Sequence, residues 1–245
     1  MRYEEFTIEG RNAVIEAYRA GRPIDKLFIL DGCQDGPILT IKREAKAKQT
    51  PVKFVTKERL DQLSETGKHQ GVIAYAAAYE YATVEEILDN ARQKGEAPFL
   101  FLLDNIEDPH NLGAILRSAE AAGVHGVIIP KRNSVTLNYT VAKTSAGAIE
   151  YVPVVKVANL PAAIDELKSR GVWIFGADMD GTDYTALDYS GSIALVIGSE
   201  GKGIGRLVRE KCDFIASLPM RGKINSLNAS VAAGILMFEA AKHRN

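Results

Sequence analysis

The last third of the chain, residues 193–242, constrains the fold most, because it combines two strand-like runs, their loops and one long helix. The first apolar run, residues 193–197, ends at the glycine-rich stretch 198–203, where a ligand can approach bare backbone. The second run, residues 214–218, ends at a proline. A polar stretch follows, and Asn228 is suited to cap the helix after it. The two loops and the helix cap are predicted to converge on one pocket.

The glycine-rich stretch does not fit two common nucleotide sites. Gly198 and Gly203 have the spacing of a phosphate-binding P-loop, but the Lys and Ser/Thr that must follow are absent. A dinucleotide fingerprint would follow the first strand of an α/β unit. The segment after residues 99–103 reads DNIEDPHN and contains no glycine. An ATPase, a conventional Rossmann site and a small-molecule nucleotide enzyme are therefore disfavoured.

Residues 1–78 alternate helical and strand-like patterns, which predicts a small α/β domain. The predicted helices span residues 12–20, 38–48 and 57–63, and the predicted strands span residues 26–30, 52–55 and 72–78. From residue 79 to residue 97 the sequence turns polar around one short amphipathic piece. We place a linker there.

Residues 98–245 are predicted to form a second α/β domain. Strands are predicted at residues 99–103, 127–129, 172–175, 193–197 and 214–216, with helices at residues 112–122, 160–169, 204–211 and 229–242. Strands that alternate with helices in this way favour a mostly parallel sheet covered on both faces.

Composition narrows the class of protein. The chain has 245 residues, a net charge of -1 and 46% hydrophobic residues, as is usual for a globular protein. Cys33 and Cys212 lie far apart in sequence and fit a reducing compartment better than a disulfide scaffold. No apolar run approaches the ~18 residues of a membrane span, and residues 1–10 do not resemble a signal peptide. The histidines lack the spacing of a zinc motif. We expect a cytoplasmic protein without a membrane span or a metal site.

Two stretches of the first domain are candidates for contact with RNA. Lys and Arg residues are frequent within residues 42–59, where they would contact phosphates or simply form a solvated helix face. The loop at residues 67–71, GKHQG, carries donors and a stackable ring before a strand, although a lone histidine is often incidental. The candidate RNA-binding residues are Lys42, Arg43, Lys46, Lys68, His69 and Gln70.

The stretch 104–123, DNIEDPHNLGAILRSAEAAG, predicts a helix with an apolar face at spacings of three and four. Arg117 lies off that face and over Gly113, where the missing side chain leaves room for a substrate beside the guanidinium. A surface ion pair with Glu120 is the alternative for Arg117.

Three motifs resemble those of a known family. NLGAILRSAEAAGV starting at Asn111, GSEGKG starting at Gly198 and SLNASVAAG starting at Ser226 resemble, in order and spacing, the motifs of the SpoU/TrmH class of RNA ribose 2'-O-methyltransferases in the SPOUT superfamily. GKHQGV at residues 67–72 and the two-domain layout look most like the RlmB branch, which methylates a guanosine of large-subunit ribosomal RNA.

The resemblance implies a fold and a set of functional residues. It implies a small L30e-like α/β RNA-binding domain at residues 1–78, a linker at residues 79–97 and a SPOUT α/β methyltransferase domain at residues 98–245. That second domain would contain a C-terminal deep trefoil knot and form a homodimer, with Ile235, Leu236 and Phe238 as candidates for the contact or for the core. S-adenosylmethionine would be the methyl donor. The implied catalytic residues are Asn111, Arg117, Glu200, Ser226 and Asn228, and the implied cofactor-binding residues are Gly198, Leu218, Met220 and Leu227.

Methylation of a ribose hydroxyl requires an enzyme that orients the hydroxyl and favours its alkoxide form. The family's arginine has been proposed to take the proton, but a guanidinium is effectively always charged. We expect Arg117 to stabilise the developing alkoxide while the proton passes to phosphate or water. Glu200 is expected to orient Arg117 or Asn111 or to bind backbone donors. Asn228 and Ser226 are expected to position the methyl donor or to cap the final helix. A tRNA target and a non-catalytic RNA-binding or ribosome-assembly protein of the same fold are the alternatives.

Overall fold

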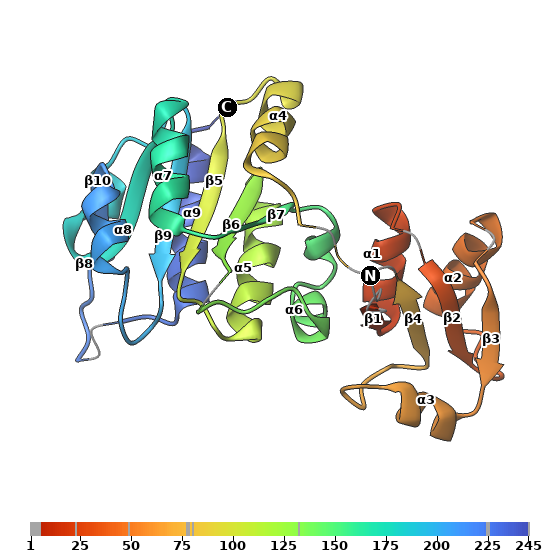
Figure 1. Cartoon of the computed structure of the whole chain (residues 1–245). Coiled ribbons are helices and arrows are strands. Elements are labelled where there is room, and N and C mark those ends of the chain that lie inside the picture. Colours follow the sequence, from red (N-terminus) through yellow and green to blue (C-terminus); the bar gives the residue numbers. More distant parts are fainter. Residues whose placement is uncertain are drawn as a thin grey trace. The chain divides into compact units, whose positions relative to one another are not determined.

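The computed structural model describes residues 6–22, 24–48, 50–76, 79, 81–131, 133–223 and 226–244. The chain divides into two compact units: unit 1 is Met1–Glu80 with Leu137–Tyr151, and unit 2 is Tyr81–Thr136 with Val152–Asn245 (Figure 1). Each unit is built around its own sheet, so the predicted mixed α/β class is confirmed. Every helix within the described residues is too short or too polar to cross a membrane.

The described residues of unit 1 form a four-stranded sheet with helices on both faces. The strand order is β1-β4-β2-β3, in which β4 is antiparallel to β1 and β2, and β2 is parallel to β3. Leu27 and Ile29 of β2 face the core formed with α1 and α2, whereas Phe28 faces Leu60 of α3. In chain order the elements are β1 (Phe6–Glu9), α1 (Arg11–Arg19), β2 (Ile24–Leu30), α2 (Gly36–Ala47), β3 (Val52–Val55), α3 (Lys57–Leu63) and β4 (Val72–Ala76).

A second piece of chain, Leu137–Tyr151, completes unit 1. It contains α6 (Tyr139–Thr144) and the 3-10 helix η1 (Ala148–Glu150). Glu150 Oε1 accepts a hydrogen bond from Arg22 Nη1 at 2.7 Å, and both side chains are almost fully buried. Burial raises the pKa of Glu150, an effect that the facing guanidinium opposes. The sequence patterns predicted this piece to lie in the second domain. Its pairing with Arg22 leaves no local pattern, because the two partners are 128 residues apart.

The described residues of unit 2 form a six-stranded parallel sheet in the order β10-β8-β9-β5-β6-β7. The predicted parallel sheet is confirmed. Sequence analysis missed β7, which has four residues and only two buried positions, and so gives a weak pattern. In chain order the elements are α4 (Val84–Lys94), β5 (Phe99–Asp104), α5 (Pro109–Ala121), β6 (Gly126–Pro130), β7 (Val154–Val157), α7 (Leu160–Ser169), β8 (Trp173–Asp183), η2 (Tyr184–Ala186), β9 (Ile193–Gly198), α8 (Arg206–Lys211), β10 (Phe214–Ser217) and α9 (Ala229–Lys242).

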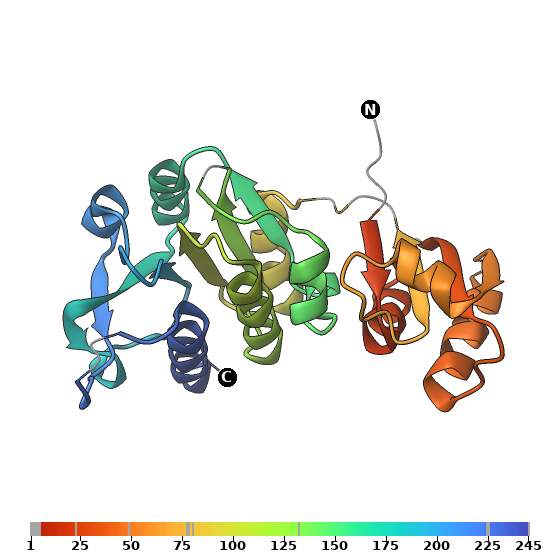
Figure 2. The same cartoon turned by 90° about the horizontal axis from the view of Figure 1, so that it is seen from below.

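Helices cover both faces of the parallel sheet. Leu100 and Leu102 of β5 share one core with α4, α7 and α8. The alternate residue Phe101 faces the other side, where α5 (olive) and α9 (dark blue) lie opposite α7 (teal) in Figure 2. These two helices pack against each other. The helix α4 lies within residues 79–97, the segment assigned to a linker, and its Ile87 is fully buried in the sheet's core.

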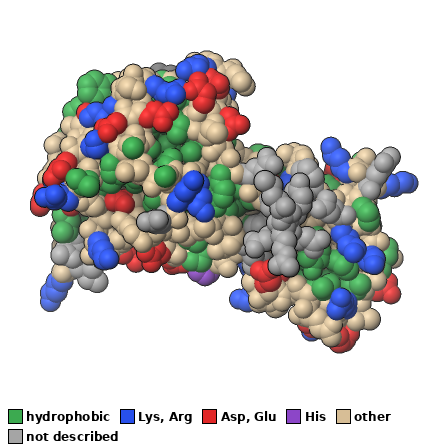
Figure 3. Space-filling view, in the orientation of Figure 1, with side chains coloured by type: hydrophobic (Ala, Val, Ile, Leu, Met, Phe, Trp, Pro, Cys, Tyr) green, Lys and Arg blue, Asp and Glu red, His purple; other side chains and the backbone are tan. Residues whose placement is uncertain are grey.

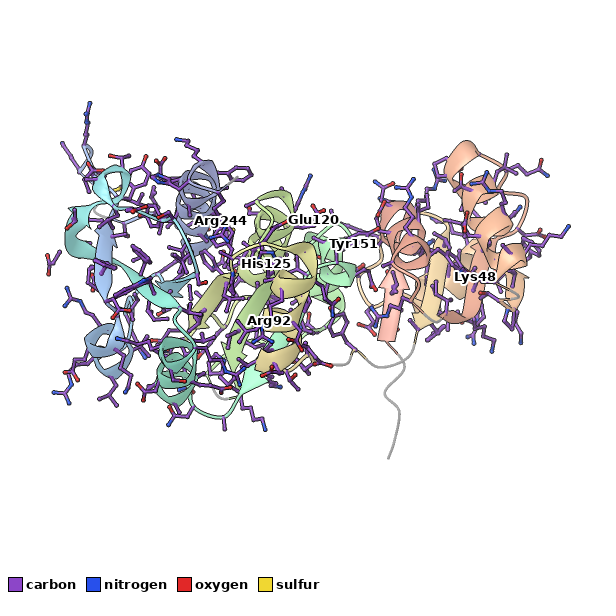
Figure 4. All side chains as sticks on the ribbon, turned by 90° about the horizontal axis from the view of Figure 1, so that it is seen from above. Lys48, Arg92, Glu120, His125, Tyr151 and Arg244 are labelled. Atoms are coloured by element: carbon purple, nitrogen blue, oxygen red, sulfur yellow. The ribbon has the colours of Figure 1, made fainter. Side chains whose placement is uncertain are left out.

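The buried histidine of unit 2, His125, fixes the start of β5. Its ring is fully buried, and Figure 4 labels it inside the unit. Phe99 N donates to Nδ1 at 3.0 Å, so Nε2 carries the proton, and it faces Glu96 Oε2 at 3.1 Å. The far end of the same strand carries Asp104, which borders the site described below.

Acid pH is expected to weaken unit 2 through His125. Burial lowers the pKa of His125 below its ordinary value of 6.5. The unfolded chain therefore binds this proton more readily, so the contribution of His125 is complete above about pH 6.5 and is lost as the pH falls further. We expect the free energy of unfolding to fall by at most about 1.4 kcal/mol per pH unit from this residue. Denaturant titrations between about pH 7.5 and about pH 5 measure it.

The matched variant is His125→Gln, whose amide oxygen can still accept the hydrogen bond from Phe99 N. It should show a shallower loss of stability on acidification than the wild type. Equal pH dependence in the two proteins would contradict the assignment to His125.

Candidate active site

A cavity of about 270 Å³ lies beside the carboxyl end of β9. In the central pair of strands, Asp104 of β5 is opposite Gly198 of β9. From β5 the chain continues to β6 on one side, whereas β8 and β10 lie on the other side of β9. Such a divergence leaves a crevice at the carboxyl ends of parallel strands. The cavity is lined by Ala177, Asp178, Met179, Ile197, Gly198, Ser199, Glu200, Gly201, Lys202, Gly203, Ala216, Leu218, Met220, Ser226, Leu227, Ala229 and Ala232.

The cavity brings together both predicted strand-ending loops and the predicted helix cap. The loop after β9, the segment after β10 and the first turn of α9 all contribute to its wall. All four residues predicted to bind the cofactor lie on this wall, as do two of the predicted catalytic residues. They are Gly198, Leu218, Met220 and Leu227, and Glu200 and Ser226, respectively.

The loop after β9 folds back tightly on Gly198. Gly203 N donates to Ser199 O at 2.8 Å, which closes the loop on itself. A Cβ added at Gly198 would lie 2.0 Å from the carbonyl carbon of Gly203, so only glycine fits there. Asp104 Oδ2 accepts a hydrogen bond from Gly205 N at 2.7 Å and holds the far end of the loop against β5.

Glu200 is the centre of a polar cluster formed by Asn111, Glu200 and Asn228. Glu200 Oε1 accepts hydrogen bonds from Asn111 Nδ2 at 3.1 Å and from Asn228 Nδ2 at 2.5 Å. It also accepts from the backbone of Ala229 at 3.2 Å, so the carboxylate lies at the positive N-terminus of α9. Asn228 Nδ2 donates to Asn111 Oδ1 at 2.9 Å, which closes the cluster into a ring.

The cluster is held by two helix starts. Asn228 is the N-cap of α9, and its Oδ1 accepts from Ser230 N at 2.9 Å. Asn111 lies in the first turn of α5, which begins after the cap residue Asp108, and its side chain is buried. The predicted capping role of Asn228 is confirmed, because the oxygen of its amide caps α9 while its nitrogen bonds the cluster.

Arg117, unlike the other predicted catalytic residues, belongs neither to the cluster nor to the cavity wall. It lies on α5 six residues after Asn111, about 9 Å further along the helix axis. Its side chain is exposed, and within the described residues it forms no hydrogen bond or ion pair. The alternative pairing with Glu120, which Figure 4 labels, is also missing from these contacts. Of the two partners predicted for Glu200, the structure brings Asn111 to it and not Arg117.

The strand β8 contributes a part of the cavity wall that the sequence patterns did not indicate. The predicted strand ended at residue 175, whereas β8 continues to Asp183 and places Asp178 and Met179 on the wall. Asp178 Oδ2 accepts a hydrogen bond from Arg209 Nε of α8 at 2.8 Å. The acidic run GADMDGTD hid the strand, because Asp and Gly are depleted in strands. Ala177 and Met179 alternate with Asp178 and Asp180, but the alternation is too short to have indicated a strand that reaches Asp183.

In unit 1, the predicted RNA-binding loop is fixed from three sides. Glu9 Oε1 accepts a hydrogen bond from Glu65 N at 2.7 Å, and Arg11 Nε donates to Gln70 O at 3.0 Å. His69 Nδ1 accepts from Gly71 N at 3.0 Å, so its other nitrogen carries the proton and faces Asp61 Oδ1 at 3.0 Å. The ring is buried and shapes the loop, whereas sequence analysis expected it to be free to stack on a base.

The remaining RNA candidates lie at the surface of unit 1. Lys68 and Gln70 are exposed on the loop. Arg43 and Lys46 are exposed on α2, and Lys42 is half-buried beside them. No group of three metal-ligating side chains occurs in the described part of the chain.

Comparison with known proteins shows what this arrangement resembles. Residues 98–238 match the model of the SpoU rRNA Methylase family, and residues 7–82 match that of the RNA 2'-O ribose methyltransferase substrate binding domain. The chain is 49% identical to the putative TrmH family tRNA/rRNA methyltransferase YacO of Bacillus subtilis, over 96% of this chain and 95% of the relative.

Two solved structures have the same fold across nearly the whole chain. The SpoU methyltransferase AviRb from Streptomyces viridochromogenes, in complex with the cofactor AdoMet, has a TM-score of 0.82 and 26% identity, and the match covers 97% of this chain and 89% of that one. The AdoMet-bound rRNA methyltransferase from Sinorhizobium meliloti has a TM-score of 0.82 and 26% identity, with 98% and 87% covered.

Proposed function

The chain belongs to the SpoU rRNA methylase family, and from this premise we propose that it transfers a methyl group from S-adenosylmethionine to a ribose 2'-hydroxyl of RNA. The observation that carries the proposal is the closed polar cluster of Asn111, Glu200 and Asn228 beside the cavity. The substrate-binding match over residues 7–82 supports RNA as the partner of unit 1.

The proposed target is a guanosine of large-subunit ribosomal RNA, in the cytoplasm. The resemblance to the RlmB branch through GKHQGV supports it. The relative's name covers both tRNA and rRNA, so a tRNA ribose is the alternative target. A non-catalytic RNA-binding protein is the weaker alternative, because it would not need the complete cluster of donors and acceptors beside the cavity.

The cavity suits S-adenosylmethionine in its chemistry. Its wall combines the bare backbone of residues 198–203 with the aliphatic side chains of Leu218 and Leu227, groups that can bond the edge and pack against the face of an adenine ring. When bound, the cofactor supplies a methyl group already activated by its sulfonium, so the transfer itself needs no metal. We assign the cofactor-binding role to Gly198, Leu218, Met220 and Leu227.

The residues around the cavity would hold the ribose for reaction. Glu200 fixes the amides of Asn111 and Asn228, so the two side chains cannot rotate independently. We assign these amides and Ser226 to orienting the 2'-hydroxyl. Correct alignment of the reacting groups can supply a large part of the reduction in the activation barrier. Arg117, whose charge is permanent, stabilises negative charge on the 2'-oxygen, and the proton passes to phosphate or water.

A homodimer through the catalytic domain is part of the proposal. Val231, Ile235 and Phe238 recur at spacings of four and three on α9, and all three are exposed. Leu236, the other apolar candidate, is 1% exposed and belongs to the core. An exposed apolar helix face of this kind supports contact with a second copy, and the resemblance places the active site near it.

The finer features of the fold are also proposals. They are an L30e-like fold for the RNA-binding domain of residues 1–78, and a deep trefoil knot near the C-terminus of the methyltransferase domain, which α4 joins in place of the predicted linker. The hydrogen bond from Asn228 to Glu200 supports the knot. The strand β10 lies at the edge of the sheet, and this bond brings the chain that follows it back to the loop after the central strand β9.

The proposed reaction is tested with methyl-labelled S-adenosylmethionine and ribosomal RNA from cells that lack the protein. We expect label at one ribose 2'-oxygen, which nucleotide mapping identifies. A tRNA pool in a parallel reaction tests the alternative target. If neither RNA is labelled while S-adenosylhomocysteine still binds, the proposed substrate is wrong. If neither RNA is labelled and S-adenosylhomocysteine does not bind, the result favours the non-catalytic protein.

Substitution of Arg117 is expected to separate catalysis from cofactor binding. Arg117→Ala should lower methyl transfer about 100-fold, because a cation that stabilises developing charge is lost. Cofactor affinity should stay unchanged, because Arg117 does not line the cavity. The exposed arginine of α8, Arg206, provides the control variant Arg206→Ala, which should transfer methyl groups normally. Near-normal turnover by Arg117→Lys would show that a planar guanidinium is not needed.

A further inference from the structure

Unit 1 exposes one aromatic ring on the outermost strand of its sheet. Phe54 belongs to β3, which lies at the edge of the strand order, and it is 54% exposed. Its neighbour two positions back, Val52, packs into the core beneath α1 and α2, so Phe54 projects on the same side of the sheet as α2. The ring thus lies beside a helix rather than under one.

A lysine of α2 is fixed over this ring. Lys42 Nζ lies 5.0 Å from the centroid of Phe54. The same nitrogen donates to Cys33 O at 2.8 Å, which anchors the lysine from the other side. A cation near an aromatic face is attracted by the ring quadrupole, so the pair restrains the ring. More than half of Phe54 stays accessible, and a flat ligand can therefore reach it.

Two further cations lie within about one turn of Lys42 on α2, and they are at most weakly paired. Arg43 and Lys46 lie on the exposed side of the same helix. Lys46 has no ion pair within the described residues, and Arg43 reaches Glu44 only at 3.5 Å. In unit 2 several lysines pair closely with carboxylates, Lys168, Lys211 and Lys242 among them. Figure 3 shows Lys and Arg side chains exposed beside hydrophobic ones on unit 1. Figure 4 labels Lys48, which caps the C-terminus of α2.

We propose that Phe54, with Lys42, Arg43 and Lys46, forms a surface on which an unpaired base of the substrate RNA stacks while the cations contact its flanking phosphates. The proposal rests on the proposed function, which names RNA as the substrate. It adds that the RNA presents a single-stranded segment to unit 1.

The chemistry of this Phe54 surface favours RNA over a protein strand. An edge strand can pair with another strand, but lysines beside an edge discourage such pairing. Aromatic rings next to unpaired lysines match single-stranded nucleic acid, because every base has a face that stacks and every nucleotide has a phosphate. Phosphate contacts also depend on salt and stacking does not, so the two contributions can be measured separately.

The test measures binding of the full chain to a fluorescein-labelled single-stranded RNA of about 12 nucleotides and to the same sequence as a duplex. Phe54→Ala should weaken single-strand binding about ten-fold without changing the salt dependence. Lys46→Ala should lower the slope of log affinity against log salt by about one. Phe54→Trp should retain the affinity, because its ring also stacks. Duplex binding should change little in either Phe54 variant.

Leu207→Ala is the matched control, since Leu207 is an exposed apolar residue of α8 in unit 2 with 57% of its surface accessible. It should bind RNA within about two-fold of the wild type. If Phe54→Ala binds single strands with wild-type affinity, the proposal is overturned. If the sedimentation coefficient of that variant also changes, the edge strand β3 serves a contact between proteins instead. Wild-type protein that methylates RNA but binds no single strand overturns only this proposal, whereas wild-type protein that neither binds nor methylates RNA overturns the proposed function as well.

Discussion

Gly198→Ala loses most of its affinity for S-adenosylmethionine, because the added methyl group has no space. A Cβ at this position would lie 2.0 Å and 2.1 Å from the carbonyl carbon and oxygen of Gly203, and 2.3 Å from the nitrogen of Ile204. All three are backbone atoms, so the loop after β9 must move as a whole. Strain of this kind costs about 3 kcal/mol, which corresponds to about 100-fold weaker binding if the loop yields. Calorimetric titration with S-adenosylhomocysteine measures the loss.

Gly201→Ala is the matched control for this loop. A Cβ at Gly201 meets no atom within 4 Å, and its backbone is not in the left-handed region. The same substitution three residues away should therefore bind nearly as tightly as the wild type. Thermal denaturation of both variants shows whether Gly198→Ala stays folded. Wild-type affinity in a folded Gly198→Ala protein would mean that the cofactor does not bind in this cavity.

Glu200→Ala is expected to lower methyl transfer by about 100-fold or more. Glu200 Oε1 accepts hydrogen bonds from three donors, which are the side chains of Asn111 and Asn228 and the backbone nitrogen of Ala229. Without it the two amides lose their common acceptor, and a misaligned group costs rate even where it does not contact the reacting atoms. Single-turnover transfer from labelled S-adenosylmethionine at saturating RNA measures the effect.

Two further variants show whether the loss comes from positioning or from folding. Glu200→Gln keeps an oxygen acceptor but not the charge, so it should recover part of the rate. Glu166→Ala removes an exposed glutamate from α7, on the opposite face of the sheet, and should transfer methyl groups normally. Because Glu200 also faces the N-terminus of α9, a small drop in melting temperature is expected in Glu200→Ala. A full loss of activity in Glu200→Gln would indicate that the charge itself takes part.

The polar cluster shows what residue patterns can predict about this site. Asn111, Glu200 and Asn228 follow strand ends or begin helices, and these positions are recognisable along the sequence. Their mutual bonds are not, because the partners lie 89 and 117 residues apart. Arg117 illustrates the same limit: helical periodicity predicted that it leaves the apolar face, but no pattern predicted that it also stays away from the cluster.

Errors in the predicted elements have local causes. The length of β8 was underestimated because acidic residues and glycines interrupt its apolar pattern after residue 175. His69 was a candidate for stacking on a base because it lies in the loop GKHQG, whereas hydrogen bonds with Gly71 and Asp61 hold its ring inside. An unusual strand composition explains the first error, and side-chain hydrogen bonds within the loop and to the nearby α3 explain the second.

By itself, the sequence determined the α/β class, the parallel sheet of unit 2 and the residues that the family motifs contribute, because periodicity and motifs are properties of neighbouring residues. Tertiary structure alone decided which of these residues meet. It joined α5, the loop after β9 and the cap of α9 into one cluster, and it built Leu137–Tyr151 into unit 1 through the buried pair of Arg22 and Glu150. The physical reason is that such contacts depend on chain crossings that bring distant residues within hydrogen-bonding distance, and no local preference encodes them.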